Sequence, residues 1–142
     1  MAANVILYTN PQSRGRIARW MLEEAGVTYD VQALDYGTTM KAPDYLAINP
    51  MGKVPALKHG DVIVTEAAAI CAYVADIFPA AGLAPAVSDP ARGDYYRWLF
   101  FAAGPLEYAA TNKAMKFIHP PEQNVMMGYG TYADVLDALD RK

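Results

Sequence analysis

The sequence predicts an α/β domain followed by an incomplete all-helical domain. Short apolar runs alternate with helical stretches in the first part of the chain, and only helical spacing follows. A stretch rich in Ala, Pro and Gly, from Pro79 to Asp89, separates the two parts. The 142 residues are enough for one full domain and part of a second. A content of 54% hydrophobic and 19% charged residues favours a packed core over disorder.

The first elements predict a strand, a helix and a second strand. Val5–Tyr8 is typical of a short buried strand, and the turn over Asn10–Ser13 ends in a residue type that often caps helices. Gly26 ends the helix that follows, and Tyr29–Leu34 alternates apolar and polar residues like a strand. Two strands joined by one helix pair in parallel. The apolar face predicted for the helix consists of Ile17, Trp20, Met21 and Ala25.

The next elements predict a short helix, a hairpin and a longer helix. Pro43 suits the first turn of a helix over Lys41–Leu46. Ala56–Leu57 and Val62–Val64 then form the two arms of a hairpin, because a Gly-Asp turn lies between them. Glu66–Phe78 follows as a helix. Its expected buried stripe consists of Ile70, Tyr73, Val74 and Ile77.

The resulting order is β-α-β-α-β-β-α, with a parallel strand pair first and an antiparallel hairpin later. This order predicts a mixed four-stranded sheet with helices on both faces, which is the thioredoxin-like plan. We assign residues 1–79 to this domain, residues 80–89 to a linker and residues 90–142 to the helical domain.

The second domain is expected to contain two helices. Asp89-Pro90 has the form of a helix start, and Gly104-Pro105 should kink the long helix that follows. A last helix is expected to start near Glu122. Two helices cannot enclose the apolar side chains present, so the domain is predicted to be incomplete. The stripe expected on the long helix consists of Tyr95, Trp98, Leu99, Ala102, Leu106 and Ala109.

Charge and composition exclude several classes of function. The net charge is −3 and no broad basic patch appears, so we expect no nucleic-acid partner. No apolar stretch has membrane-spanning length, and the N-terminus lacks the features of a secretory signal. The single cysteine, Cys71, excludes an internal disulfide and suits a reducing compartment, so a cytoplasmic location is expected. His59 and His119 have no ligand partner at useful spacing, so we expect no metal.

Four segments together resemble the cytosolic glutathione transferase family, and within it the bacterial, theta-like branch. They are Tyr8–Arg14, Asn49–Pro55, Thr65–Ile70 and Tyr73–Pro79. The resemblance implies a thioredoxin-like glutathione-binding domain, an all-helical second domain and usually a homodimer. It also implies glutathione as co-substrate, added to an apolar electrophile or used to reduce a disulfide or peroxide. Family members normally continue well past this point, so the chain resembles a truncated member.

The resemblance leaves three candidates for the group that binds the glutathione sulfur. Ser13 lies where the first helix is expected to begin, where its hydroxyl can donate to sulfur beside the positive helix end. It is equally suited to be a plain N-cap, and one hydroxyl proton cannot serve two acceptors. In theta-like members the active serine precedes an arginine by a few residues, and counting back from Arg14 leads to Asn10. Thr9 stays open because some bacterial relatives use Thr and Asn in this loop.

The resemblance implies a set of glutathione-binding residues in the rest of the first domain. Val54-Pro55 matches the family's cis-proline turn, which exposes the Val54 backbone to the cysteinyl residue of glutathione. Glu66 can bind the ligand ammonium, or can be merely an acidic residue that complements a helix dipole. Ala67 replaces the family's serine and keeps only the backbone N–H for the γ-glutamyl carboxylate. Lys41 and Lys53 are candidates for the glycyl carboxylate, or are solvated lysines.

A second function class is a non-catalytic module for protein interaction on the same fold. Ala67 and the short chain favour it, whereas the retained Val54-Pro55, Glu66 and Ser13 favour the enzyme. A glutaredoxin-like redox protein is disfavoured because the loop after the first strand has no cysteine. Four aromatics of the second domain are expected to pack in a core or a dimer, or to line an electrophile pocket: Phe100, Phe101, Tyr108 and Phe117.

Overall fold

The computed structural model describes residues 4–117 and 119–141. The chain divides into two compact units, the first ending at Val87 and the second starting at Ser88. This division falls inside the segment that the sequence indicates as a linker. No helix among the described residues has the length and apolar character needed to cross a membrane.

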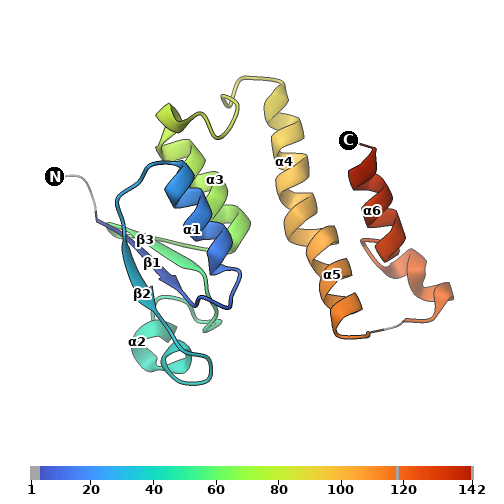
Figure 1. Ribbon diagram of the computed structural model, residues 1–142, viewed down its shortest axis with the longest axis horizontal. Coiled ribbons are helices and arrows are strands. Elements are labelled where there is room, and N and C mark those ends of the chain that lie inside the picture. The colour runs from blue at the N-terminus through green and yellow to red at the C-terminus, as the bar shows by residue number, and fades with distance from the viewer. Residues whose placement is uncertain (1–3, 118, 142) are drawn as a thin grey trace. The chain divides into compact units, whose positions relative to one another are not determined.

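The first unit contains a mixed four-stranded sheet in the order β2-β1-β3-β4 (Figure 1). β1 is parallel to β2 and antiparallel to β3, and β3 is antiparallel to β4. The predicted thioredoxin-like order is confirmed. The elements are β1 (Val5–Thr9), α1 (Gly15–Glu24), β2 (Asp30–Ala33), α2 (Pro43–Leu46), β3 (Ala56–His59), β4 (Val62–Thr65) and α3 (Ala67–Ile77).

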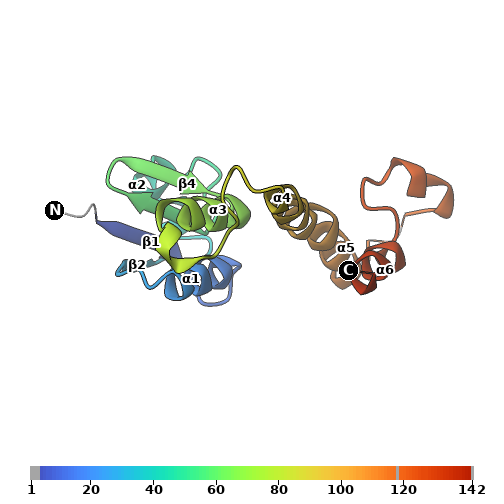
Figure 2. The same cartoon turned by 90° about the horizontal axis from the view of Figure 1, so that it is seen from above.

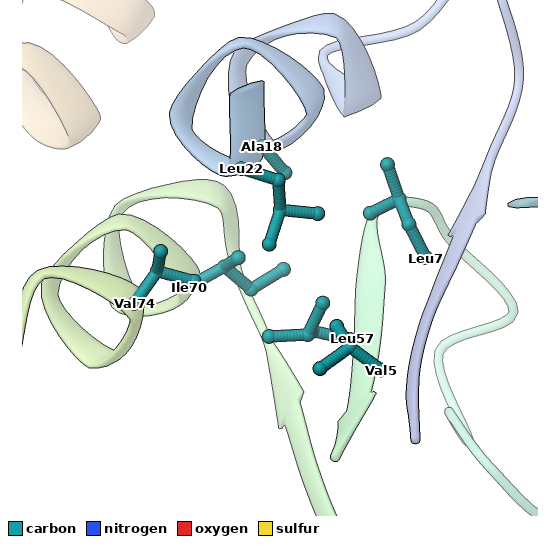
Figure 3. Close-up of a cluster of buried hydrophobic side chains, with 7 residues drawn as sticks. All are labelled: Val5, Leu7, Ala18, Leu22, Leu57, Ile70 and Val74. Atoms are coloured by element: carbon teal, nitrogen blue, oxygen red, sulfur yellow. The ribbon is translucent and has the colours of Figure 1, made fainter. Parts of the chain in front are cut away.

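Helices cover both faces of this sheet, as the sequence predicted. α1 and α3 lie on one face and α2 lies on the other (Figure 2). Side chains alternate along a strand, so β1 contributes Leu7 to the first face and Tyr8 to the second. The larger core cluster joins β1, β3, α1 and α3 (Figure 3) and consists of Val5, Leu7, Ala18, Leu22, Leu57, Ile70 and Val74.

The buried face of α1 differs from the prediction. Ala18 and Leu22 are fully buried, whereas Ile17 and Trp20 are 46% and 67% exposed. The close approach of Gly15 to β1 explains the rotation, because a Cβ on Gly15 would lie 2.0 Å from Thr9 Oγ1. With Gly15 facing the strand, the positions three and seven residues later also face inward. The predicted Met21 and Ala25 pack only at the margin of the core.

Two predicted elements have different bounds for identifiable reasons. β2 is shorter than Tyr29–Leu34, and its four residues are all exposed because it is an edge strand. The helix predicted over Lys41–Leu46 begins only at Pro43. Ala42 precedes that proline and is extended, with φ −69° and ψ 147°, so Lys41 belongs to a separate 3₁₀ turn.

The second unit is helical. α4 (Ala91–Phe101) continues through a π-helical turn (Ala102–Leu106) into α5 (Glu107–Ala114), and α6 (Tyr132–Asp140) comes last. The π turn contains Gly104 and Pro105, where the sequence predicted a kink, because proline cannot donate to the α-helical ladder.

The start of the last helix near Glu122 was predicted wrongly. Glu122 lies in a 3₁₀ helix (Pro121–Met126), and α6 begins ten residues later at Tyr132. A capping box sets this start: Thr131 Oγ1 accepts from the Asp134 N–H at 3.1 Å, and Asp134 Oδ2 accepts from the Thr131 N–H at 2.8 Å.

The apolar stripe predicted on α4 and α5 is mostly half-buried, and only Ala109 in it is buried. The aromatics Phe100, Tyr108 and Phe117 are 67%, 63% and 63% exposed. The described helices of this unit therefore leave large apolar side chains uncovered, as expected for a helical unit with a small core.

Candidate functional site

The sheet register places three loops at one end of the sheet. Tyr8 of β1 pairs with Ala56 of β3, and Ala56 pairs with Thr65 of β4. The residues just beyond this row are therefore neighbours across the sheet. They are the start of the β1–α1 loop at Asn10, the turn at Val54-Pro55 that leads into β3, and Glu66 after β4. The topology brings most of the sequence-predicted residues to one end of the sheet.

The Ser13 hydroxyl is bonded on both sides within the β1–α1 loop. Its Oγ donates to the Asn10 carbonyl oxygen at 2.7 Å and accepts from the Gly15 N–H at 3.0 Å. The N-cap of α1 is Arg14, one residue later than predicted, and the Arg14 side chain makes no capping hydrogen bond. Ser13 therefore stabilises the turn before the helix. Its hydroxyl must rotate away from Asn10 to donate to a ligand, since it has one proton.

Asn10 and Thr9 have structural roles in the same loop. The Asn10 Nδ2 donates to the Leu34 carbonyl at 2.8 Å, and its Oδ1 accepts from the Gln12 N–H at 2.9 Å. Asn10 thus ties the loop to the chain just after β2 and keeps one amide hydrogen for another partner. Thr9 is only 7% exposed and lies under Gly15. Of the three sulfur candidates, Ser13 and Asn10 are partly exposed and Thr9 is buried.

The Val54–Pro55 peptide bond is cis, as the resemblance implied. Val54 is half-buried and Pro55 is buried. Within residues 4–117 and 119–141, the Val54 N–H and C=O have no hydrogen-bond partner. A backbone donor and acceptor at the end of a sheet can pair with an extended peptide as a strand would.

The turn before Val54 is held by two side chains that sequence reasoning gave no role. The Lys53 carbonyl oxygen accepts from Tyr45 Oη at 2.5 Å and from Asn49 Nδ2 at 2.8 Å. Tyr45 and Asn49 are 3% and 4% exposed. The Tyr45 hydroxyl is protonated at neutral pH and can donate, and burial raises its pKa further above the ordinary value. An Asn before proline in a Gly- and Pro-rich turn was the available sequence clue.

Glu66 has an unusual backbone conformation at the N-terminus of α3. Its φ is 66° and its ψ is 124°, which is disfavoured for any residue with a side chain and costs about 1–3 kcal/mol. Its carboxylate is exposed and does not cap the helix. The alternative role considered from the sequence was an acidic residue of the first turn that complements the helix dipole, but Glu66 is the N-cap residue, just before that turn. The first helical bond runs from the Ile70 N–H to the Glu66 carbonyl at 2.9 Å. The N–H of Ala67 thus has no intrahelical acceptor.

The two candidate lysines are exposed, and they differ in their contacts. Lys41 Nζ donates to the Met51 carbonyl at 3.0 Å. The segments around Met40 and Gly52 approach closely here: a Cβ on Gly52 would lie 2.7 Å from the Met40 carbonyl oxygen. Lys53 directs its carbonyl to the interior, and its ammonium has no partner in the part of the chain that the structure describes.

An open cavity of about 340 Å³ lies between α1 and β2. Of the residues that the sequence predicts to bind glutathione or its sulfur, the cavity contains only Thr9, and of the three loops it adjoins only the β1–α1 loop, through Pro11. Its lining consists of Thr9, Pro11, Arg16, Arg19, Trp20, Glu23, Val31 and Ala33.

The other titratable candidates lie outside the three loops. Cys71 is on α3 and half-buried, and burial raises the pKa of its thiol. His59 hydrogen-bonds to the Tyr73 hydroxyl at 3.0 Å between Nδ1 and Oη. The described residues contain no group of three or more His, Cys, Asp or Glu side chains that could hold a metal.

The family model for the N-terminal domain of glutathione S-transferase matches residues 3–76. Among curated relatives, glutathione S-transferase GST-4.5 of Xanthomonas campestris pv. campestris is 35% identical over 95 residues, which are 67% of this chain and 46% of that protein. The probable glutathione S-transferase GSTF2 of Oryza sativa subsp. japonica is 53% identical over 55 residues, 38% of this chain and 26% of that protein. The chain thus spans less than half of these relatives.

A glutathione transferase homologue from Sulfitobacter, whose crystal structure contains bound glutathione, is 30% identical with a TM-score of 0.66. The match covers 98% of this chain and 66% of that one. The region matched by the family model includes all three loops at the end of the sheet.

Proposed function

Since the chain belongs to the glutathione S-transferase family, we propose that it binds reduced glutathione at the three loops and activates its thiol. The observation that carries the proposal is the Val54 backbone, which has no hydrogen-bond partner among the described residues. Val54 precedes β3, and β3 lies between β1, which leads to the N-terminus of α1, and β4, which leads to the N-terminus of α3. The bound glutathione in the Sulfitobacter relative supports the choice of ligand.

Each part of the tripeptide then has a complementary group. The Val54 N–H and C=O pair with the cysteinyl residue. The Glu66 carboxylate takes the γ-glutamyl ammonium, and the Ala67 N–H takes the adjoining carboxylate at the helix end. Lys41 and Lys53 are the cations for the glycyl carboxylate. The absence of a hydroxyl at Ala67 removes a hydrogen bond of about 1 kcal/mol.

The reaction requires the thiolate of glutathione. A thiol with a pKa of about 8.5 is only a few per cent ionised at neutral pH. We assign Ser13 as the group that lowers this pKa, with Asn10 second, because a hydroxyl released from the Asn10 carbonyl can donate to sulfur near the N-terminus of α1. The thiol proton leaves to solvent, and sulfur bonds to an electrophilic carbon. In a substitution, the leaving group departs with the bonding electron pair.

The enzyme proposal is tested by the pKa of bound glutathione, measured from the ultraviolet absorbance of its thiolate across a pH titration. We expect a value below that of free glutathione in the wild type and a value at least about one unit higher in Ser13→Ala, since one unit corresponds to about 1.4 kcal/mol. Asn10→Ala is the comparison that ranks the two candidates. A bound thiol with the same pKa as free glutathione would contradict thiolate activation.

The second candidate function is a non-catalytic interaction module of the same fold. The observations that favour it are the engaged Ser13 hydroxyl and the exposed aromatics Phe100, Tyr108 and Phe117. Turnover of an activated aryl chloride separates the two candidates. Glutathione binding without turnover, in a sample with wild-type helicity, supports the module.

A further inference from the structure

Asn49 is a buried polar residue whose backbone and side chain form hydrogen bonds in the turn that leads to Val54. Its backbone N–H donates to the Tyr45 carbonyl and its own carbonyl accepts from the Gly52 N–H, both at 2.8 Å. Its Oδ1 accepts from the Met51 N–H at 3.1 Å, and its Nδ2 donates to the Lys53 carbonyl at 2.8 Å. A 4% exposed amide with partners at both ends fixes the path of the chain over these residues.

Tyr45 donates the second hydrogen bond to the same carbonyl. Its Oη lies 2.5 Å from the Lys53 oxygen, and its ring packs against Tyr8 of β1 with 5.6 Å between the ring centroids. A carbonyl oxygen accepts two hydrogen bonds, so Tyr45 and Asn49 together satisfy the Lys53 carbonyl. That carbonyl is therefore fixed toward the buried side of the turn, where both donors lie.

The orientation of this carbonyl determines the orientation of the next N–H. The Lys53–Val54 peptide bond is trans, and in a planar trans peptide the C=O and the following N–H point in opposite directions. With the Lys53 oxygen bonded to the buried pair, the Val54 N–H must point away from Tyr45 and Asn49. This is the N–H that has no protein partner among the described residues.

We propose that Asn49 and Tyr45 are positioning residues that aim the Val54 N–H at the cysteinyl carbonyl of glutathione. The inference rests on the proposed function for its ligand. Neither side chain touches the tripeptide; both act through the Lys53–Val54 peptide plane. The Val54 N–H is then already oriented before glutathione binds, so the turn before Val54 does not have to be ordered on binding.

The test uses two variants of the full chain and one matched control. Asn49→Asp keeps the acceptor for Met51 and loses the donor to Lys53, and Tyr45→Phe removes the other donor. Tyr73→Phe is the control, since it deletes the hydroxyl bonded to His59, outside the three loops. We expect the Kd for reduced glutathione, measured by calorimetry, to rise about tenfold in each positioning variant and less than about twofold in the control.

A second readout separates positioning from general loss of stability. The Val54 amide resonance of ligand-free, ¹⁵N-labelled protein should shift in Asn49→Asp and Tyr45→Phe, because the Lys53–Val54 peptide plane changes its orientation, and should not change in Tyr73→Phe. If Asn49→Asp does not fold, Tyr45→Phe provides both readouts.

Two results would overturn the proposal. One is folded variants with a wild-type Kd and an unchanged Val54 resonance. The other is an equal loss of affinity in Tyr73→Phe, which would indicate that stability alone was affected. A wild-type protein that fails to bind glutathione refutes the proposed function instead, and the Val54 resonance of the variants then still decides whether the two donors orient this peptide.

Discussion

The polar groups of the candidate site fall into two kinds at the scale of single residues. Ser13 is bonded within the β1–α1 loop, and Asn10 is bonded both within this loop and to the chain just after β2, so their first effect is on the conformation of the loop. The Val54 backbone and the exposed Glu66 carboxylate are not used in this way among the described residues. The groups that we propose to bind the ligand at Val54 and Glu66 are therefore available as they stand, whereas the Ser13 hydroxyl, which we propose to activate sulfur, must first exchange a partner.

Asp134 gives a pH dependence that can be assigned to one residue. Hydrogen bonds from the Thr131 hydroxyl and the Thr131 N–H lower the pKa of this carboxyl. Because the folded pKa is lowered, its contribution to the stability of α6 is present above the ordinary value of about 3.9 and is lost as pH falls through the lowered pKa.

We therefore expect the backbone amide signal of Asp134 in NMR to change in acid, when the cap is lost. The Asp134→Asn variant should not show this change. Asp137, in the same helix, is the control position, and Asp137→Asn should retain this change. A wild-type cap that persists unchanged after Asp134 is protonated would contradict the assignment.

At the scale of elements, the close packing of α1 on β1 depends on Gly15. A Cβ there would lie 2.0 Å from Thr9 Oγ1 and 2.9 Å from Ser13 Oγ. We expect Gly15→Ala to lower the free energy of unfolding by about 1–3 kcal/mol, measured by urea denaturation, because α1 or Thr9 must shift.

Gly93 provides the matched control on another helix. It lies in α4, and a Cβ there would meet nothing within 4 Å. Gly93→Ala should be neutral or stabilising by up to about 1 kcal/mol, the ordinary difference in helix propensity. Equal destabilisation by both substitutions would contradict the role given to the Gly15 contact.

The order of elements was predictable from the sequence, because the spacing of apolar residues and the turn residues are local properties. The cis bond of the Val54–Pro55 turn was predicted only through the family resemblance. The face of α1 was not, since it depends on the contact between Gly15 and Thr9 across two elements. The start of α6 was missed although Thr131 and Asp134 have the spacing of a capping box. The roles of Asn49 and Tyr45 required the structure, because their shared acceptor is a backbone carbonyl.

At the scale of the whole molecule, the exposed aromatics of the second unit lead to a prediction about association. Phe100, Tyr108 and Phe117 are each more than 60% exposed, and exposed apolar surface commonly packs against a partner. We propose that the chain forms a dimer or a larger assembly with itself. Light scattering should give at least twice the mass of one chain, and a monodisperse monomer would contradict the proposal.

The central claim, that the three loops form a glutathione site, is tested most directly by calorimetric titration of the 142-residue chain with reduced glutathione. We predict one binding site per chain with millimolar or tighter affinity. Cysteinylglycine should bind much more weakly, because it lacks the γ-glutamyl group that Glu66 and Ala67 are proposed to bind. No binding by a folded sample, or equal binding of the two peptides, would contradict this account of the site.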